Sequence, residues 1–254
     1  MRIDRGSADP GSRPRQGDAP GGAFDAVVFD LDGTLADTAE DLSDAMNRVL
    51  RGRGFAVHDV DAYKQMVGKG IRNLVTVALP PGARDEATVT ACNDELLADY
   101  GEHCLVKTRL YPGITELLGA LKAEGIPLAV FSNKAEGLTR RIVGALTAPG
   151  VFVAVVGARA GRPLKPDPTP ALRLAELLGS APARVAYVGD SGTDMRTAVA
   201  AGMQPVGVSW GFRSPAELVE HGAAVVLDHP RQLLDLLHHR GSRRPAGDQP
   251  VATG

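Results

Sequence analysis

The stretch Val27-Val28-Phe29-Asp30-Leu31-Asp32-Gly33-Thr34-Leu35 decides the fold of this chain. Its apolar, β-branched beginning predicts a short buried strand, which two carboxylates follow at positions i and i+2. Because side chains alternate along an extended backbone, Asp30 and Asp32 are expected on the same side. Carboxylates that converge at a buried strand end repel each other, and a cation or a charge-rich ligand offsets that repulsion. The stretch therefore predicts a charged site at the end of a central strand.

A second acidic cluster follows another apolar stretch, Val185-Ala186-Tyr187-Val188-Gly189. Asp190 leaves this strand, and Asp194 enters the helix expected after it, where a helix N-terminal charge is an alternative role. Ligands bind at the carboxyl ends of strands in open parallel sheets. Carboxylates gathered there suit a hard divalent ion such as Mg²⁺, which takes one or two of them plus waters and phosphate oxygens.

Two further groups follow predicted strands: Ser132-Asn133-Lys134, and Lys165 in the stretch Lys165-Pro166-Asp167-Pro168. A hydroxyl with nearby backbone N–H groups binds phosphate oxygens, and so does an ammonium. Lys134 ranks below Lys165 because it reads equally as a surface residue. Asp167 is interpreted as a turn residue.

Strand-length apolar runs alternate with helix-length amphipathic runs, which predicts an α/β fold with a doubly wound, Rossmann-like parallel sheet. The predicted strands span residues 26–31, 127–132, 152–156, 185–188, 205–208 and 225–227. The predicted helices between them span residues 114–124, 136–146, 171–178, 195–201, 216–221 and 232–238.

Residues 37–112 interrupt this alternation with helical periodicity, predicted as helices over 41–51, 60–66, 72–78 and 86–100. A structureless loop of that length is implausible in a compact domain. A helical cap over 37–112 is therefore expected, inserted into a core formed by 24–36 and 113–239. Asp37-Thr38-Ala39-Glu40 has the spacing of a helix capping box. Residues 1–23 and 240–254, rich in Gly, Pro, Arg and Asp, are predicted to be disordered tails.

Composition excludes several classes of protein. With 254 residues, 44% of them hydrophobic, the chain can bury a full core, and 28 basic against 30 acidic residues give no reason to expect nucleic-acid or membrane-surface binding. Two cysteines exclude a disulfide framework. No apolar run approaches the ~18 residues of a membrane span, and residues 1–22 lack a signal-like stretch. A soluble, cytoplasmic protein is expected.

Four motifs in order resemble the phosphatase branch of the haloacid dehalogenase superfamily with a helical cap. They are Asp30-x-Asp32-Gly-Thr-Leu, Ser132-Asn133, Lys165-Pro and Gly189-Asp190-Ser191-x-x-Asp194. The resemblance implies that Asp30 attacks phosphorus, that Asp32 protonates the leaving oxygen and later activates water, and that Ser132 and Lys165 hold phosphoryl oxygens. It also implies Mg²⁺ held by Asp30, the backbone carbonyl of Asp32 and Asp190, with Asp194 on a metal-bound water.

The resemblance extends to the substrate, expected to be a small phosphorylated metabolite. A carboxylate at position 32 favours phosphate esters over haloacids, because a halide leaving group needs no proton. Gly68-Lys69-Gly70 and Ser209-Trp210-Gly211-Phe212 resemble segments of phosphoglycolate phosphatases, which implies 2-phosphoglycolate. Asn133, Lys69 and Arg72 are the candidate substrate contacts, although an exposed turn explains Lys69 equally well.

Three other functions remain open. A phosphosugar mutase of the β-phosphoglucomutase type would share the nucleophile, the acid and the cap. A hydrolase of another small phosphate, such as a nucleotide or pyrophosphate, would share the reaction. A non-catalytic binding protein on the same fold is disfavoured by the complete set of motif residues. The sequence does not indicate an oligomeric state.

Overall fold

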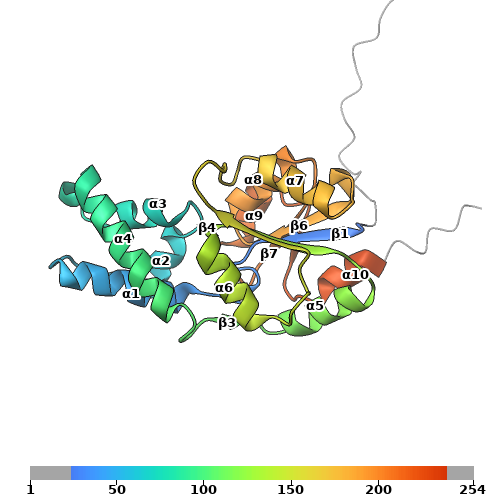
Figure 1. Ribbon diagram of the computed structural model, residues 1–254. Helices are drawn as coiled ribbons and strands as arrows, with labels where there is room; N and C mark the ends of the chain where they lie inside the picture. The colour runs from blue at the N-terminus through green and yellow to red at the C-terminus, as the bar shows by residue number, and fades with distance from the viewer. Residues whose placement is uncertain (1–23, 239–254) are drawn as a thin grey trace, which may run out of the picture.

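The centre of the molecule is a six-stranded parallel sheet, seen in a computed structural model that describes residues 24–238 (Figure 1). Its strand order is β5-β4-β1-β6-β7-β8. The strands are β1 (Ala26–Phe29), β4 (Leu128–Ala135), β5 (Ala154–Ala158), β6 (Val185–Gly189), β7 (Gln204–Val208) and β8 (Val225–Leu227). Because β1 pairs with β4 on one side and with β6 on the other, Asp30 follows an interior strand. The predicted fold class is confirmed.

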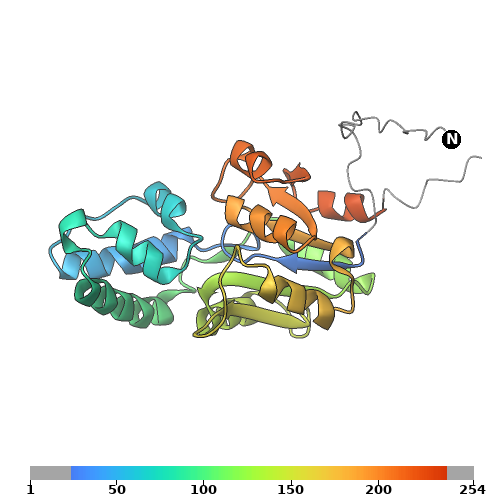
Figure 2. The same cartoon turned by 90° about the horizontal axis from the view of Figure 1, so that it is seen from above.

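Helices cover both faces of the sheet (Figures 1 and 2). They are α5 (Ile114–Ala123), α6 (Glu136–Leu146), α7 (Thr169–Leu177), α8 (Gly192–Ala200), α9 (Pro215–Glu220) and α10 (Gln232–His238). The alternation along β1 divides the core, because Val28 packs with α7 and α8 whereas Phe29 packs with α5, α6 and α10. A fully buried apolar side chain of this size stabilises the fold by ~1.5–3 kcal/mol. Burial of β1 on both faces thus fixes the position of its carboxyl end.

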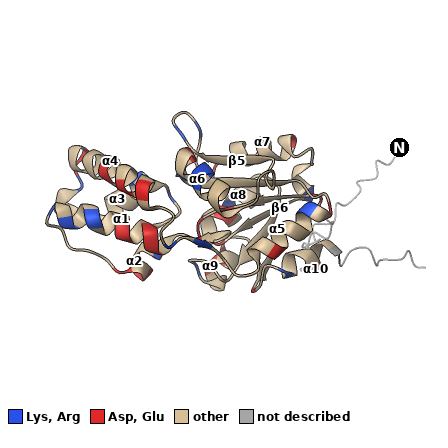
Figure 3. Ribbon diagram, turned by 60° about the horizontal axis from the view of Figure 1, so that its bottom comes forward, with Lys and Arg blue, Asp and Glu red and all other residues tan. Residues whose placement is uncertain are grey.

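Four helices between β1 and α5 form a separate layer beside the sheet, which we call the cap (Figure 2). They are α1 (Ala39–Gly52), α2 (Val60–Met66), α3 (Ile71–Ala78) and α4 (Glu86–His103). Charged residues lie along α1 and α4 (Figure 3). An ion pair joins Arg48 to Asp99 at 2.5 Å. An exposed pair of this kind contributes only ~0–1 kcal/mol. The fully buried Met46, Leu96 and Tyr100 therefore hold the cap together.

The chain enters and leaves the cap through two short strands that pair antiparallel, β2 (Ala36–Asp37) and β3 (Arg109–Leu110). The buried carboxylate of Asp41 accepts hydrogen bonds from the N–H groups of Lys107 and Thr108, each at 2.9 Å. Both crossings are therefore tied to the start of α1. Sequence patterns did not predict β2 and β3, since two residues are too few to show alternation.

The predicted capping box at the start of α1 is wrong. Thr38 occupies the N-cap position but makes no side-chain hydrogen bond to the helix. Its hydroxyl instead donates to Asp32 Oδ1 at 2.5 Å, a charge-assisted hydrogen bond that is stronger than the neutral bond its oxygen would accept from an N–H of the first turn. The local spacing was right for a cap, but a contact with the core prevailed.

Some sequence predictions lie outside the described residues, namely the tails at 1–23 and 240–254 and the last core position, 239. Within residues 24–238, every predicted helix is present, and no end shifts by more than three positions. None of the helices described there combines the length and the apolar character needed to cross a bilayer.

Candidate active site

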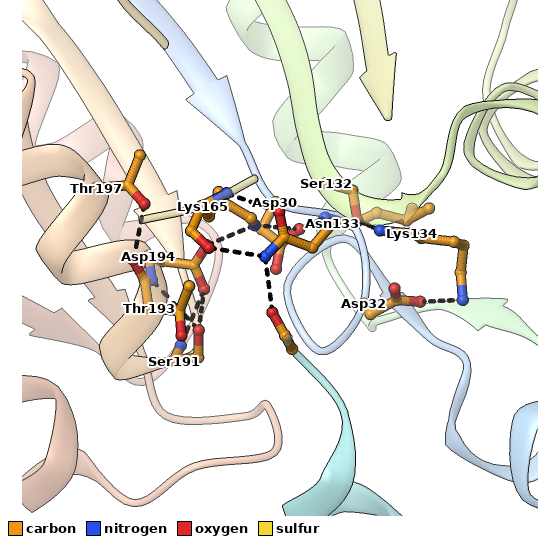
Figure 4. A network of polar contacts seen from close by, with 12 residues as sticks. Asp30, Asp32, Ser132, Asn133, Lys134, Lys165, Ser191, Thr193, Asp194 and Thr197 are labelled. Carbon is orange, nitrogen blue, oxygen red and sulfur yellow. Dashed lines mark hydrogen bonds and ion pairs between the residues drawn. The ribbon is translucent and has the colours of Figure 1, made fainter. Parts of the chain in front are cut away.

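A cavity lies where the carboxyl ends of the strands meet the cap, with an internal volume of about 40 Å³. It brings together side chains that follow β1, lie on β4, precede α7 and follow β6 (Figure 4). The core residues lining it are Asp30, Asp32, Ser132, Asn133, Lys134, Lys165, Asp190, Ser191, Phe212 and Arg213. The cap contributes Leu42, Val67, Gly68, Gly70, Ile71 and Leu74.

Asp30 sits at the base of this cavity, directly after β1. Its N–H donates to the Val188 carbonyl at 2.9 Å, and its Oδ1 accepts the Leu31 N–H at 2.7 Å. Burial, and then the negative charge of Asp194, raise the pKa of Asp30 to about 7, although Lys165 opposes that change. The carboxylate is thus held in one orientation and needs positive charge nearby to remain ionised.

Lys165 supplies part of that charge. Its buried Nζ lies 2.8 Å from Asp30 Oδ1 and 2.7 Å from Asp194 Oδ1. Burial alone would lower the pKa of Lys165, but the carboxylates of Asp194 and Asp30 raise it well above its ordinary value. The ammonium is therefore a permanent cation beside Asp30, which suits it to hold a phosphoryl oxygen.

Asp194 has the helix-terminal role that the sequence left open, and it also binds Lys165. It closes a capping box on α8, in which Ser191 Oγ accepts the Asp194 N–H and Asp194 Oδ2 accepts the Ser191 N–H. Its other oxygen, Oδ1, binds Lys165. Both oxygens thus already have protein partners, which is the arrangement expected of a residue that orients a lysine.

Backbone atoms of two other segments lie close to the Asp190 side chain. The Phe212 N–H donates to its Oδ2 at 2.7 Å, and Gly33 approaches from the other side with a φ of 80°. A Cβ at position 33 would lie 2.0 Å from Asp190 Oδ2. Burial, with the charges of Asp194 and Asp30, raises the pKa of Asp190 well above its ordinary value.

Replacing Gly33 by Ala is expected to displace Asp190 and to reduce the activity of this site strongly. The left-handed backbone alone costs a non-glycine residue ~1–2 kcal/mol. Gly161→Ala is the matched control, because its φ is 74° and an added Cβ meets nothing within 4 Å. Thermal unfolding and activity against Mg²⁺ concentration measure the difference. Equal effects of the two substitutions would show that only backbone strain matters at position 33.

The acidic residues fit a divalent cation. Oxygens of Asp30, Asp190 and Asp194 all lie within 4.8 Å of one another, and all three residues are buried. Asp32 pairs with Lys134, and Lys165 pairs with both Asp30 and Asp194. Within residues 24–238, the donor to Asp190 is a backbone N–H. The cluster therefore carries excess negative charge, which Mg²⁺, a hard cation that prefers oxygen ligands, would balance.

Interpretation of Lys134 as a surface residue is wrong. The side chain is buried, with Nζ 3.0 Å from Asp32 Oδ1 and 3.1 Å from the hydroxyl of Tyr100 on the cap helix α4. Nζ also lies 4.6 Å from the centre of the Tyr100 ring. Position 134 is two residues after Ser132 on β4, and the alternation that paired Asp30 with Asp32 could have placed it in the site.

Asn133 connects the core to the cap. Its Nδ2 donates to the carbonyls of Gly68 and Lys165, and its Oδ1 accepts the Lys165 N–H at 2.8 Å. Ser132, beside it, is buried and accepts the Lys134 N–H at 3.2 Å. The two residues predicted from one motif thus act differently: Ser132 presents a hydroxyl to the cavity, and Asn133 orients Lys165.

The structure does not bring the two predicted cap cations into the lining of the cavity. Lys69 is exposed, and the Arg72 guanidinium donates to Glu86 at 2.5 Å and to Thr90 at 3.3 Å on the outside of the cap. Arg213, which sequence analysis did not single out, lines the cavity instead. Its hydrogen bonds run to a segment 146 residues or more away in the chain, so no local pattern points to it.

Comparisons with known proteins show which family this chain is similar to. Residues 27–208 match the family model described as haloacid dehalogenase-like hydrolase. A phosphoglycolate phosphatase from Rhodospirillum rubrum is 40% identical over 90% of this chain and 95% of its own. An N-acetylmuramic acid 6-phosphate phosphatase from Pseudomonas aeruginosa is 36% identical over 84% of this chain and 94% of its own.

A solved structure agrees with these relatives. It comes from Lactobacillus delbrueckii subsp. bulgaricus, carries a provisional assignment as a phosphoglycolate phosphatase, and is 31% identical with a TM-score of 0.80 over 85% of this chain and 99% of that one. The chain belongs to the haloacid dehalogenase-like hydrolases. Its relatives place it among the phosphatases of that family.

Proposed function

We propose that this enzyme is a Mg²⁺-dependent phosphomonoester hydrolase that works through an aspartyl-phosphate on Asp30, with 2-phosphoglycolate as its substrate. Residues 24–36 and 113–239 would form the catalytic core, and residues 37–112 the cap. The observation that carries the proposal is the position of Asp30, with Lys165 at 2.8 Å on one side and Asp190 within the same carboxylate cluster. A nucleophilic carboxylate beside a fixed cation and a site for a divalent ion is what phosphoryl transfer needs.

The proposed reaction has two steps. Asp30 attacks phosphorus in line, the bond from phosphorus to the ester oxygen breaks, and Asp32 gives that oxygen a proton. A water molecule then attacks the aspartyl-phosphate while Asp32 takes its proton, which releases inorganic phosphate and restores Asp30. Lys134 and Thr38 both bind Asp32 Oδ1, so Oδ2 is the oxygen left to exchange protons.

Other residues would hold the phosphoryl group in place. The Lys165 ammonium and the Ser132 hydroxyl both line the cavity and would bind its equatorial oxygens. Asp30, Asp190 and the backbone carbonyl of Asp32 would hold Mg²⁺, with Asp194 acting through a water. The bound ion would neutralise charge on the carboxylates and on the phosphoryl oxygens.

The size of the cavity supports a small substrate. A volume of about 40 Å³ is room for only a few waters or a short organic acid. Among residues 24–238, the N–H groups of Gly68, Gly70 and Ile71 have no protein partner and suit a carboxylate, and Lys69 remains a proposed contact beside them. A second candidate is an amino-sugar phosphate, favoured by the Pseudomonas aeruginosa relative, but it is bulkier than 2-phosphoglycolate and fits a cavity of this size poorly.

A panel of phosphate esters tests both parts of the proposal. Phosphate release should stop in EDTA and return with Mg²⁺, and kcat/KM should be highest for 2-phosphoglycolate, by at least about tenfold over N-acetylmuramic acid 6-phosphate. Hexose 1-phosphate and 6-phosphate in the same panel, followed for interconversion primed by a bisphosphate, test the mutase alternative. Release that is insensitive to EDTA would overturn the metal requirement, and a preference for the amino sugar would overturn the substrate.

We also propose a cytoplasmic location with a small phosphorylated metabolite as partner. Both cysteines, Cys92 and Cys104, are free and buried. Unpaired thiols are typical of reducing compartments.

A further inference from the structure

The loop between β7 and α9 touches three parts of the molecule that are remote in sequence. We call residues 210–213 the strap. Trp210 Nε1 donates to the Thr34 carbonyl at 3.0 Å, and the Phe212 N–H donates to Asp190 Oδ2 at 2.7 Å. The next residue, Arg213, reaches across to the cap. The strap therefore connects the carboxylate cluster to the cap through consecutive residues.

Arg213 binds the end of α2 with most of its donors. One terminal nitrogen donates to the carbonyl of Lys64, and the other donates to the carbonyls of Gln65 at 3.0 Å and Val67 at 2.9 Å. Its Nε lies 3.6 Å from Glu217, and the side chain is only 12% exposed. Carbonyls at a helix C-terminus lack partners within the helix, and a planar guanidinium can satisfy several of them at once.

The segment that follows α2 would otherwise be held weakly. Gly68 and Gly70 have φ values of 116° and 87°, and both line the cavity. Glycine backbone loses more freedom on ordering than that of any other residue, so the position of this segment depends on the contacts at its ends. From the core, Arg213 binds Val67 and Asn133 binds Gly68. Within the cap, the Gly70 carbonyl accepts the first hydrogen bond of α3.

We propose that Arg213 is a positioning residue that holds cap residues 67–70 over the cavity, so that substrate meets a lining that is already in place. Three of its five N–H donors bind backbone carbonyls of the cap, and it acts through the segment that it holds. The proposal rests on the proposed function only for the choice of ester.

Arg141 provides a matched control. It also extends from the core, on α6, and donates to a cap carbonyl, that of Gly101 on α4. Neither Arg141 nor Gly101 lines the cavity. Removing either arginine deletes a bond between core and cap, but only Arg213 holds a segment that faces the substrate.

Steady-state kinetics of Arg213→Gln, Arg213→Lys and Arg141→Gln test the role, using 2-phosphoglycolate and the best other ester of the panel. Arg213→Gln should raise KM by about tenfold, because a smaller fraction of the enzyme has its lining in place. Saturating substrate restores that arrangement, so kcat should change by less than about threefold. Arg213→Lys should recover part of the KM, and Arg141→Gln should resemble the wild type.

Amide hydrogen exchange gives a readout that needs no substrate. Peptides covering residues 60–74 should exchange faster in Arg213→Gln than in the wild type or in Arg141→Gln. An unchanged exchange rate in Arg213→Gln would overturn the proposal, as would a fall in kcat with KM unchanged or an equal rise of KM in Arg141→Gln. Failure to hydrolyse 2-phosphoglycolate would instead overturn the proposed substrate, and exchange with kinetics on the other ester would still test Arg213.

Discussion

Asp30→Asn is expected to reduce phosphate release by roughly 10⁴-fold or more, because an amide cannot serve as the nucleophile. The change keeps the size of the side chain, and the amide oxygen can still accept the Leu31 N–H that Asp30 Oδ1 now accepts. Phosphate release with and without Mg²⁺, and mass spectrometry of quenched reactions for a phosphorylated enzyme, measure the effect. Wild-type turnover in this variant would contradict covalent catalysis at Asp30.

The same substitution should leave metal-free stability unchanged or higher. Burial and the charge of Asp194 both disfavour an ionised carboxylate at position 30, and asparagine removes that charge. Activity should therefore fall while the melting temperature stays the same or rises, which a damaged fold would not produce. Asp61→Asn, on the exposed surface of the cap, is the control and should change neither quantity.

Asp32→Asn is expected to lower turnover by ~10²–10⁴-fold, the usual contribution of general acid and base catalysis. The defect should depend on the leaving group. A p-nitrophenyl ester, whose leaving group needs no proton, should still phosphorylate Asp30 readily, whereas an alkyl ester should not. Rapid-quench measurements of phosphorylated enzyme distinguish the two steps, and equal losses for both esters in the first step would contradict the assignment of Asp32 as the acid.

The stability of this second variant needs its own control. Asp32→Asn leaves the buried ammonium of Lys134 with the Tyr100 hydroxyl but without its carboxylate. Breaking a buried ion pair on one side costs ~3–5 kcal/mol. The double substitution Asp32→Asn with Lys134→Met should recover much of the melting temperature without recovering turnover. That outcome would separate the chemical role of Asp32 from its role as a partner of Lys134.

Local patterns predicted the residues that stand at strand ends, and the cavity brings these together: Asp30, Asp32, Ser132, Lys165 and Asp190. Asp30, Asp32 and Asp190 follow buried strands, Ser132 lies on β4, and Lys165 lies in the loop between β5 and α7. A parallel sheet places the carboxyl ends of its strands at one edge. Sequence patterns did not predict Arg213, because its three acceptors are backbone carbonyls, which every residue type has. Arg72 was misplaced because spacing along α3 does not reveal that Glu86 faces it from α4.

Because β2 pairs with β3, the chain enters and leaves the cap at neighbouring positions. Ala36 lies opposite Leu110 in an antiparallel ladder, so the chain returns to the place it left. A tight two-residue turn can close such a ladder. Helical inserts of other lengths and shapes could therefore replace this one without altering the path of any core strand. A recombination event at these two positions would exchange the cap surface that faces the substrate, while Asp30 and Asp32 would keep their places on the core.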